Sequence, residues 1–192
     1  MDLILASTSP YRKSLLQRLQ IPFRTLAPEV DESALADETP TELVARLALA
    51  KARALSGTHP AALVIGSDQV ATLDGQIMGK PGHHQAAVTQ LRACSGREVR
   101  FHTGLAVVCE TTGFQQVHVE PFTVQFRELS SSAIENYLQR EQPYDCAGSF
   151  KCEGLGIALF SGLSGNDPTA LEGLPLISLV KMLECAGLSP LN

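Results

Sequence analysis

The segment from Ile65 to Pro81 constrains the fold of this chain most strongly, because it joins a predicted buried strand to a tight turn. The apolar run at its start is typical of a buried strand. A carboxylate, Asp68, follows just past the predicted end of that strand. The pair Asp74-Gly75 is the strongest short signal of a β-hairpin, which returns the chain to Lys80. An aspartate at a strand end is often only a turn residue, but this unit also suits a site for an anion and a metal ion.

The size of the chain favours a single domain. Its 192 residues, 44% of them hydrophobic, are enough for one domain over residues 1–192 with two lobes around one cleft.

The net charge of −5 argues against a nucleic acid polymer as partner. No signal peptide and no membrane-spanning stretch is recognisable, which predicts a cytoplasmic protein without membrane contact. Five cysteines without a C-x-x-C motif are expected to be reduced thiols.

The first predicted strand leads into a candidate phosphate site. The apolar run over residues 3–6 reads as a buried strand, and Ser7 lies in the turn that follows it. Ser9 is a natural N-cap, with proline at the first helical position after it. Arg12 and a neighbouring lysine fall in the first helical turn, where cations are disfavoured unless an anion binds. Hydroxyls, free N–H groups and cations favour a phosphate site here over solvated surface charges.

The next segment offers candidates for metal and phosphate binding. Residues 21–38 are predicted to be irregular and acidic, either a solvated loop or a segment that brings Asp31 or Glu32 to a divalent cation. A capping box at Thr39 predicts a helix to about residue 55. Lys51 lies beside the apolar face of that helix. It either extends to solvent or points into a cleft.

The second half of the chain is predicted to contain a helix over 85–94, a β-hairpin of strands over 99–109 and 117–127, a helix that a second capping box starts at Ser132, a short strand over 155–160, and a last helical region to Cys185, interrupted near 173–175. No internal repeat or linker is visible. The five histidines form no recognisable ligand pair.

These motifs together resemble the Maf family of nucleotide pyrophosphatases. The resemblance spans nearly the whole chain and rests on five motifs in order: Leu5-Ala6-Ser7-Thr8-Ser9-Pro10-x-Arg12, Val30-Asp31-Glu32, Lys51, Gly66-Ser67-Asp68-Gln69 with Gly79-Lys80-Pro81, and Asp145-Cys146-Ala147-Gly148 to Gly156. It implies an elongated α/β fold similar to inosine triphosphate pyrophosphatases, with a central mixed β-sheet flanked by helices and a deep cleft. It also implies a hydrolase that cleaves nucleoside triphosphates to the monophosphate and diphosphate.

The resemblance assigns roles to individual residues. Asp68 takes the position of the catalytic base, and Glu32 and Asp68 take positions near a divalent metal ion, expected to be Mg²⁺ with Mn²⁺ or Co²⁺ as alternatives. The triphosphate-binding positions are Ser7, Ser9, Arg12, Lys51 and Lys80. These assignments suit phosphoanhydride hydrolysis, in which positioning and charge stabilisation supply most of the catalysis.

Three further residues predict the base that is recognised. An aromatic residue at Tyr11 and a glutamate at Glu153 resemble the subfamily that hydrolyses 7-methyl-GTP, although its members typically carry tryptophan at the first position. A tyrosine face attracts the cationic 7-methylguanine ring. Two carboxylate oxygens can accept hydrogen bonds from the N1–H and N2–H edge of guanine, which a glutamine cannot match. Gln69 is expected to assist this discrimination.

Other readings remain open at this point. A dTTP/UTP pyrophosphatase of the same family is the alternative among enzymes. A nucleotide-binding regulator of cell division with little turnover is the alternative outside them, although Asp68, Lys51 and Lys80 argue against it. Tyr11 could instead pack on Leu15, and Glu153 could be an exposed loop charge. Resemblance to the family is compatible with a homodimer.

Overall fold

The computed structural model describes all residues, 1–192. Helices and strands alternate along much of the chain, which confirms the predicted α/β class. The elements are β1 (Leu3–Ala6), α1 (Pro10–Gln17), β2 (Arg24–Leu26), α2 (Pro40–Ser56), β3 (Leu63–Leu73), β4 (Gln76–Met78), α3 (His84–Cys94), β5 (Glu98–Cys109), β6 (Phe114–Phe126), α4 (Ser131–Glu141), β7 (Phe160–Gly165) and α5 (Leu176–Cys185), with 3₁₀ turns at Ala147–Ser149, Leu155–Leu159 and Pro168–Ala170.

The sheet is mixed, as expected. Its strand order is β2-β1-β3-β5-β6-β7, and β4 pairs with β3. Strand β1 pairs in parallel with both β2 and β3. Strands β3 and β4 are antiparallel, and so are β6 and β7.

The chain forms two compact units. The first unit contains Met1–Gln69, Thr103–Glu120 and Asp167–Asn192, and the second contains Val70–His102 and Pro121–Asn166. Strands β3, β5 and β6 contribute residues to both. The cleft expected from the sequence stays a prediction. None of the helices combines the length and the apolar composition that a membrane span requires.

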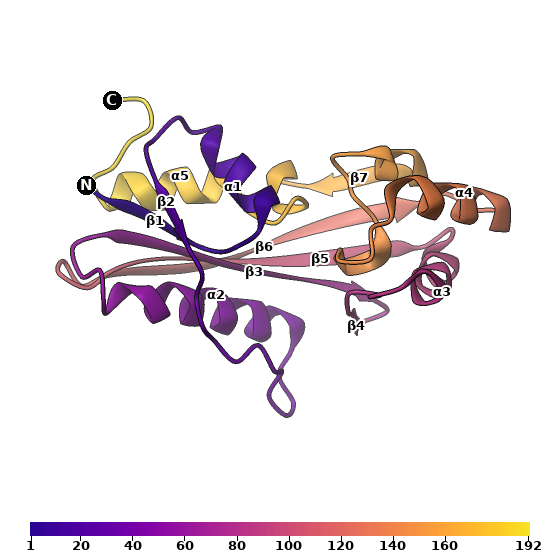
Figure 1. The fold of residues 1–192 in the computed structure, drawn as a ribbon, viewed down its shortest axis with the longest axis horizontal. Helices are drawn as coiled ribbons and strands as arrows, with labels where there is room; N and C mark the ends of the chain where they lie inside the picture. The colour runs from indigo at the N-terminus through magenta and orange to yellow at the C-terminus, as the bar shows by residue number, and fades with distance from the viewer. The chain divides into compact units, whose positions relative to one another are not determined.

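The first unit has helices on both faces of its strands (Figure 1). Alternate residues of β1 and β3, such as Leu5 and Ile65, pack against α1 and α5. The intervening residues, such as Ile4 and Val64, pack against α2 together with Ala48 and Ala52. Because side chains alternate along a strand, two neighbouring strands supply two separate apolar layers.

The second unit is centred on aromatic side chains. Phe150 makes edge-to-face contacts with Phe101, Phe126 and Phe160, with ring centroids 5.4, 5.6 and 4.9 Å away. Helix α3 packs against α4. The loop that carries Phe150 is therefore fixed by the core of this unit.

Most local predictions are confirmed. Ser9 caps α1 through the amide of Arg12, and Thr39 forms the capping box of α2. The hairpin at Asp74-Gly75 joins β3 to β4. All five cysteines are free thiols.

Other local predictions are wrong. Strand β3 continues to Leu73, so Asp68 lies inside the strand and not past its end. Residues 24–26 form a strand within the segment predicted to be irregular. The N-cap of α4 is Ser130 and not Ser132. Residues 155–159 form a 3₁₀ turn, and the strand begins at Phe160.

Candidate active site

Strand β3 brings Asp68 onto the face that α2 covers. Residues two apart on a strand point to the same face, so Gly66 and Asp68 share the α2 face with Val64. A Cβ atom at Gly66 would lie 2.1 Å from the carbonyl oxygen of Ala48. Glycine at this position therefore lets the helix lie directly on the strand.

That close approach places Lys51 against Asp68. Lys51 follows Ala48 by about one helical turn, so both residues face the strand. Only 6% of Lys51 and 8% of Asp68 is exposed. The Lys51 ammonium donates a hydrogen bond of 2.7 Å to Asp68 Oδ1. Lys51 is thus directed to a buried carboxylate and not to solvent.

Glu32 completes this cluster from the loop before α2. Its Oε1 atom lies 2.7 Å from Lys51 Nζ, although 62% of the Glu32 side chain is exposed. One ammonium group therefore contacts two carboxylates that lie 36 positions apart in the sequence.

The two carboxylates fit a hard divalent cation. Mg²⁺ is commonly held by one or two carboxylates, with water and substrate phosphates as the remaining ligands. Glu32 and Asp68 converge on one cationic group, which is the kind of position a metal ion takes. No group of three or more histidine, cysteine, aspartate or glutamate side chains could form a closed cage. Glu32 and Asp68 are therefore the carboxylates that would hold such an ion.

The opposite face of β3 contacts the segment before α5. Ser67 Oγ lies 2.8 Å from the carbonyl oxygen of Gly104 and 2.9 Å from that of Gly173. The Gln69 side-chain amide donates to the carbonyl oxygen of Ala170 at 2.7 Å. Arg12 Nε donates to the same Gly173 oxygen at 2.9 Å. The Gly173 carbonyl thus links Arg12 to the strand that carries Asp68.

Arg12 lies within electrostatic reach of both carboxylates. Burial lowers the pKa of the Arg12 guanidinium, while the negative charges of Asp68 and Glu32 act in the opposite direction. The first loop positions this arginine through its hydroxyls. Ser7 Oγ accepts from the Ser9 amide at 3.1 Å, and Ser9 Oγ accepts from the Arg12 amide.

Lys80 and Glu153 belong to the second unit, and both are exposed. Gly79, next to Lys80, accepts a hydrogen bond of 2.9 Å from the Gln90 side chain. Gln90 also accepts from the hydroxyl of Ser149 in the loop that carries Glu153. One glutamine of α3 therefore joins the segment of Lys80 to the segment of Glu153.

The backbone on both sides of Glu153 is fixed. The Lys151 amide donates to the hydroxyl of Tyr137 at 3.0 Å, and the Leu155 amide donates to Glu141 Oε1 at 3.0 Å. The exposed side chain of Glu153 on a fixed backbone is compatible with recognition of a ligand.

Eight of the ten predicted site residues belong to the first unit: Ser7, Ser9, Tyr11, Arg12, Glu32, Lys51, Asp68 and Gln69. Direct contacts join Lys51 to Asp68 and Glu32. Their roles in binding and catalysis stay predictions. Sequence reasoning missed Gly173, whose carbonyl oxygen accepts from Arg12 and Ser67, and Gln90, whose side chain joins the segments of Lys80 and Glu153. Only the break in helical pattern near Gly173 gave any signal.

The protein-family model described as Maf-like protein matches residues 2–186. A protein of Albidiferax ferrireducens named 7-methyl-GTP pyrophosphatase is 57% identical over 190 residues, covering 99% of this chain and 96% of that protein. Proteins with the same name from Nitrosococcus oceani and Idiomarina loihiensis are 59% and 53% identical. These alignments cover 96% and 100% of this chain, and 93% and 98% of the relatives.

Proposed function

This chain belongs to the Maf family, and from that premise we propose that it hydrolyses 7-methyl-GTP to 7-methyl-GMP and diphosphate. Relatives that are 53–59% identical over nearly the whole chain carry the name of that activity. The structural observation that carries the proposal is the buried contact of 2.7 Å between Lys51 and Asp68, with Glu32 on the same ammonium group. Such a cluster suits a reaction that needs a base, a cation and a metal ion.

In the proposed reaction one water molecule attacks the α-phosphorus, and the bond to the bridging oxygen of the β-phosphate breaks. Asp68 accepts the proton of that water, and diphosphate leaves. Arg12, Lys51 and Lys80 stabilise the charge that spreads over the phosphate oxygens, which is the main source of catalysis in phosphoryl transfer. Ser7 and Ser9 hold the loop that presents Arg12.

We propose Mg²⁺ as the cofactor, with Mn²⁺ or Co²⁺ able to replace it. Glu32 and Asp68 would hold the ion, which would neutralise the triphosphate. Tyr11, Gln69 and Glu153 are the residues proposed to select the methylated guanine. We also propose that the protein acts on free nucleotides in the cytoplasm and assembles as a homodimer.

A substrate panel tests this function. Diphosphate release is measured with Mg²⁺ for 7-methyl-GTP, GTP, UTP and dTTP at equal concentrations. We expect the highest kcat/KM for 7-methyl-GTP. Faster turnover of UTP and dTTP would instead support the pyrimidine-specific alternative. Binding of 7-methyl-GTP without diphosphate release would support the regulator.

A further inference from the structure

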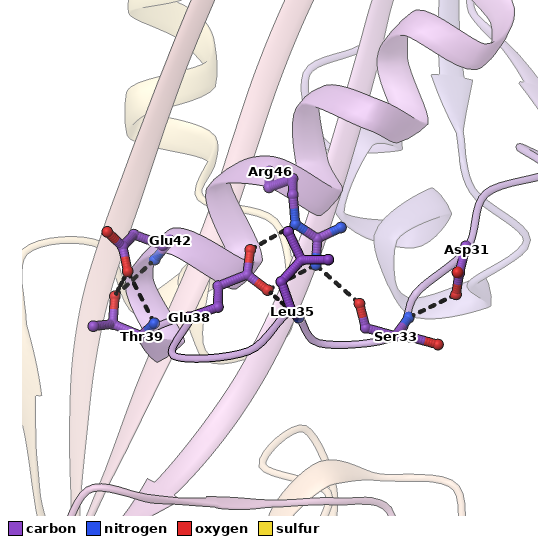
Figure 2. A network of polar contacts seen from close by, with 7 residues as sticks. All are labelled: Asp31, Ser33, Leu35, Glu38, Thr39, Glu42 and Arg46. Atoms are coloured by element: carbon purple, nitrogen blue, oxygen red, sulfur yellow. Dashed lines mark hydrogen bonds and ion pairs between the residues drawn. The ribbon is translucent and has the colours of Figure 1, made fainter.

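Arg46 holds the loop that precedes α2 (Figure 2). Its guanidinium donates to both carboxylate oxygens of Glu38, at 2.6 and 2.7 Å. The same group donates to the carbonyl oxygen of Ser33 at 3.0 Å. A planar guanidinium can make such contacts in two directions at once, and an ammonium group cannot reproduce them.

The loop is ordered further by two contacts of its own. Asp31 Oδ1 accepts from the Ser33 amide at 2.9 Å, and Glu38 Oε2 accepts from the Leu35 amide at 3.0 Å (Figure 2). Arg46 bonds to the two residues, Ser33 and Glu38, on which these contacts converge. It therefore fixes both ends of residues 33–38 to one side chain.

Glu32 is directly next to this clamp. Burial contributes little to its position, since 62% of its side chain is exposed. Its backbone neighbour Ser33 is bound by Arg46, and its carboxylate is bound by Lys51, five residues further along the same helix. Helix α2 thus holds Glu32 from two points, one on the backbone and one on the carboxylate.

We propose that Arg46 is a positioning residue that sets the affinity of the site for its divalent cation. It acts by keeping the backbone at Ser33 in place, so that the Glu32 carboxylate stays beside Asp68 and Lys51. The proposal rests on the proposed function in so far as Glu32 is taken as a metal ligand. It assigns to the Glu38–Arg46 pair a role in the site although neither residue touches Asp68 in the hydrogen bonds described.

The test compares Arg46→Met with a matched control on the same helix. Arg53 also lies in α2 and donates to a neutral group, Gln115 Oε1, at 2.6 Å. Arg53→Met therefore removes the same charge without touching the loop. Mn²⁺ binding is measured directly by electron paramagnetic resonance, in the presence of the non-hydrolysable α,β-methylene analogue of GTP, and kcat and KM are measured across Mg²⁺ concentrations.

We expect Arg46→Met to weaken Mn²⁺ binding by about tenfold, the lower end for residues that orient metal ligands. Its kcat should recover at saturating Mg²⁺, and Arg53→Met should match the unchanged chain. Amide hydrogen exchange at Ser33 and Leu35 should accelerate in Arg46→Met only. Arg46→Lys should bind Mn²⁺ little better than Arg46→Met does. Glu38→Gln, which keeps the size of the side chain, should also weaken Mn²⁺ binding.

Combination with Glu32→Gln separates positioning from a merely structural role. If Arg46 acts through Glu32, Arg46→Met has no further effect on Mn²⁺ binding in the Glu32→Gln background. Additive losses, or a lower thermal midpoint with unchanged Mn²⁺ affinity, overturn the proposal. If 7-methyl-GTP is not hydrolysed but Mn²⁺ binding depends on Glu32 and Arg46 in this coupled way, the proposed function fails and the positioning role stands.

Discussion

At the scale of single residues, the contact between Lys51 and two carboxylates determines which of these side chains can be substituted without a large loss of stability. Removal of the lysine would leave Asp68 buried without its cation, which commonly costs about 3–5 kcal/mol of stability. Removal of the Asp68 charge is milder, because Lys51 keeps Glu32 as a partner. Asp68 is therefore the better position at which to test the chemistry.

Asp68→Asn is expected to lower kcat by about 10²–10⁴-fold, the usual contribution of a general base. At saturating Mg²⁺, binding of 7-methyl-GTP should change little, since the cationic side chains stay in place and Glu32 remains as a metal ligand. Diphosphate release and equilibrium binding measure the two effects separately. Asp74→Asn is the matched control, because Asp74 is an exposed turn residue paired with Arg97. Near-normal turnover of Asp68→Asn would exclude it as the base.

Glu153→Gln is expected to reduce selectivity more than activity. The loss of one carboxylate oxygen removes a hydrogen bond to a charged group, which is worth about 1.5–3 kcal/mol, so the preference for 7-methyl-GTP over UTP should fall by about tenfold or more. The ratio of kcat/KM values measures this. Glu128→Gln, another exposed change in the same unit, should leave the ratio unchanged. An unchanged ratio in Glu153→Gln would mean that this residue does not read the base.

At the scale of elements, the sequence predicted the features that depend on residues a few positions apart. It did not predict the features that depend on contacts between distant residues. Ser9 and the hairpin at Asp74-Gly75 were predicted correctly because caps and turns depend on residues a few positions away. The length of β3 was not, because Ser67, Asp68 and Gln69 are polar and do not resemble a buried strand. Their partners come from α2, β5 and the segment before α5.

Alanine substitution of two glycines, one under α2 and one at its end, should change stability in different ways. Gly66→Ala would place a methyl group 2.1 Å from the Ala48 carbonyl oxygen, so the free energy of unfolding should fall by about 1–3 kcal/mol. Gly57→Ala meets no atom within 4 Å and keeps a helical φ of −63°, so it should be neutral or add about 0.4–1 kcal/mol. Urea denaturation measures both. Equal stability of the two variants would argue against a tight helix–strand contact.

The loop before α2 should carry a distinct pH dependence. Hydrogen bonds from Arg46 lower the pKa of Glu38 from 4.5 to about 2. Because the pKa is lower in the folded chain, the stabilisation is complete above pH 4.5 and is lost as the pH falls toward 2. The pKa of nearby Asp31 is also lowered, by its bonds to Ser33, so the comparison must isolate Glu38.

Comparison of the unchanged chain with Glu38→Gln makes that separation. The difference in unfolding free energy between the two should be largest above pH 4.5 and shrink as the pH falls. Urea denaturation at several pH values between 6 and 3 measures it, with Asp31 present in both proteins. A difference that stays constant over this range would show that the Glu38 charge does not stabilise the loop.

At the scale of the whole molecule, the sequence indicated the class of fold and the family, but not how the site is supported. Arg12, Lys51 and Asp68 could be singled out as candidates because charged side chains in these motifs are visible in the sequence, and the structure brings Lys51 into contact with Asp68. Gly173 was missed as a site residue because it acts through a carbonyl oxygen, which every residue has. Arg46 was missed because its partners are set by the path of a loop.

Binding of substrate and metal should stabilise the whole chain. A ligand that binds only the folded state, at about 100 times its Kd, adds about 2.7 kcal/mol to the free energy of unfolding. For a chain of this size that corresponds to a rise of about 5–10 °C in Tm. We expect this rise with the α,β-methylene analogue of 7-methyl-GTP and excess Mg²⁺, followed by scanning calorimetry.

Removal of the metal should cancel most of that rise. With EDTA in place of Mg²⁺, the carboxylates of Glu32 and Asp68 would face the triphosphate charges without a cation between them, and repulsion would weaken binding. Glu32→Gln should therefore lose less of the rise on chelation than the unchanged chain does. Asp74→Asn, away from these contacts, should behave like the unchanged chain. A rise in Tm that is equal with and without Mg²⁺ would mean that the triphosphate binds through the cationic side chains alone, and Glu32 would then have no part in holding it.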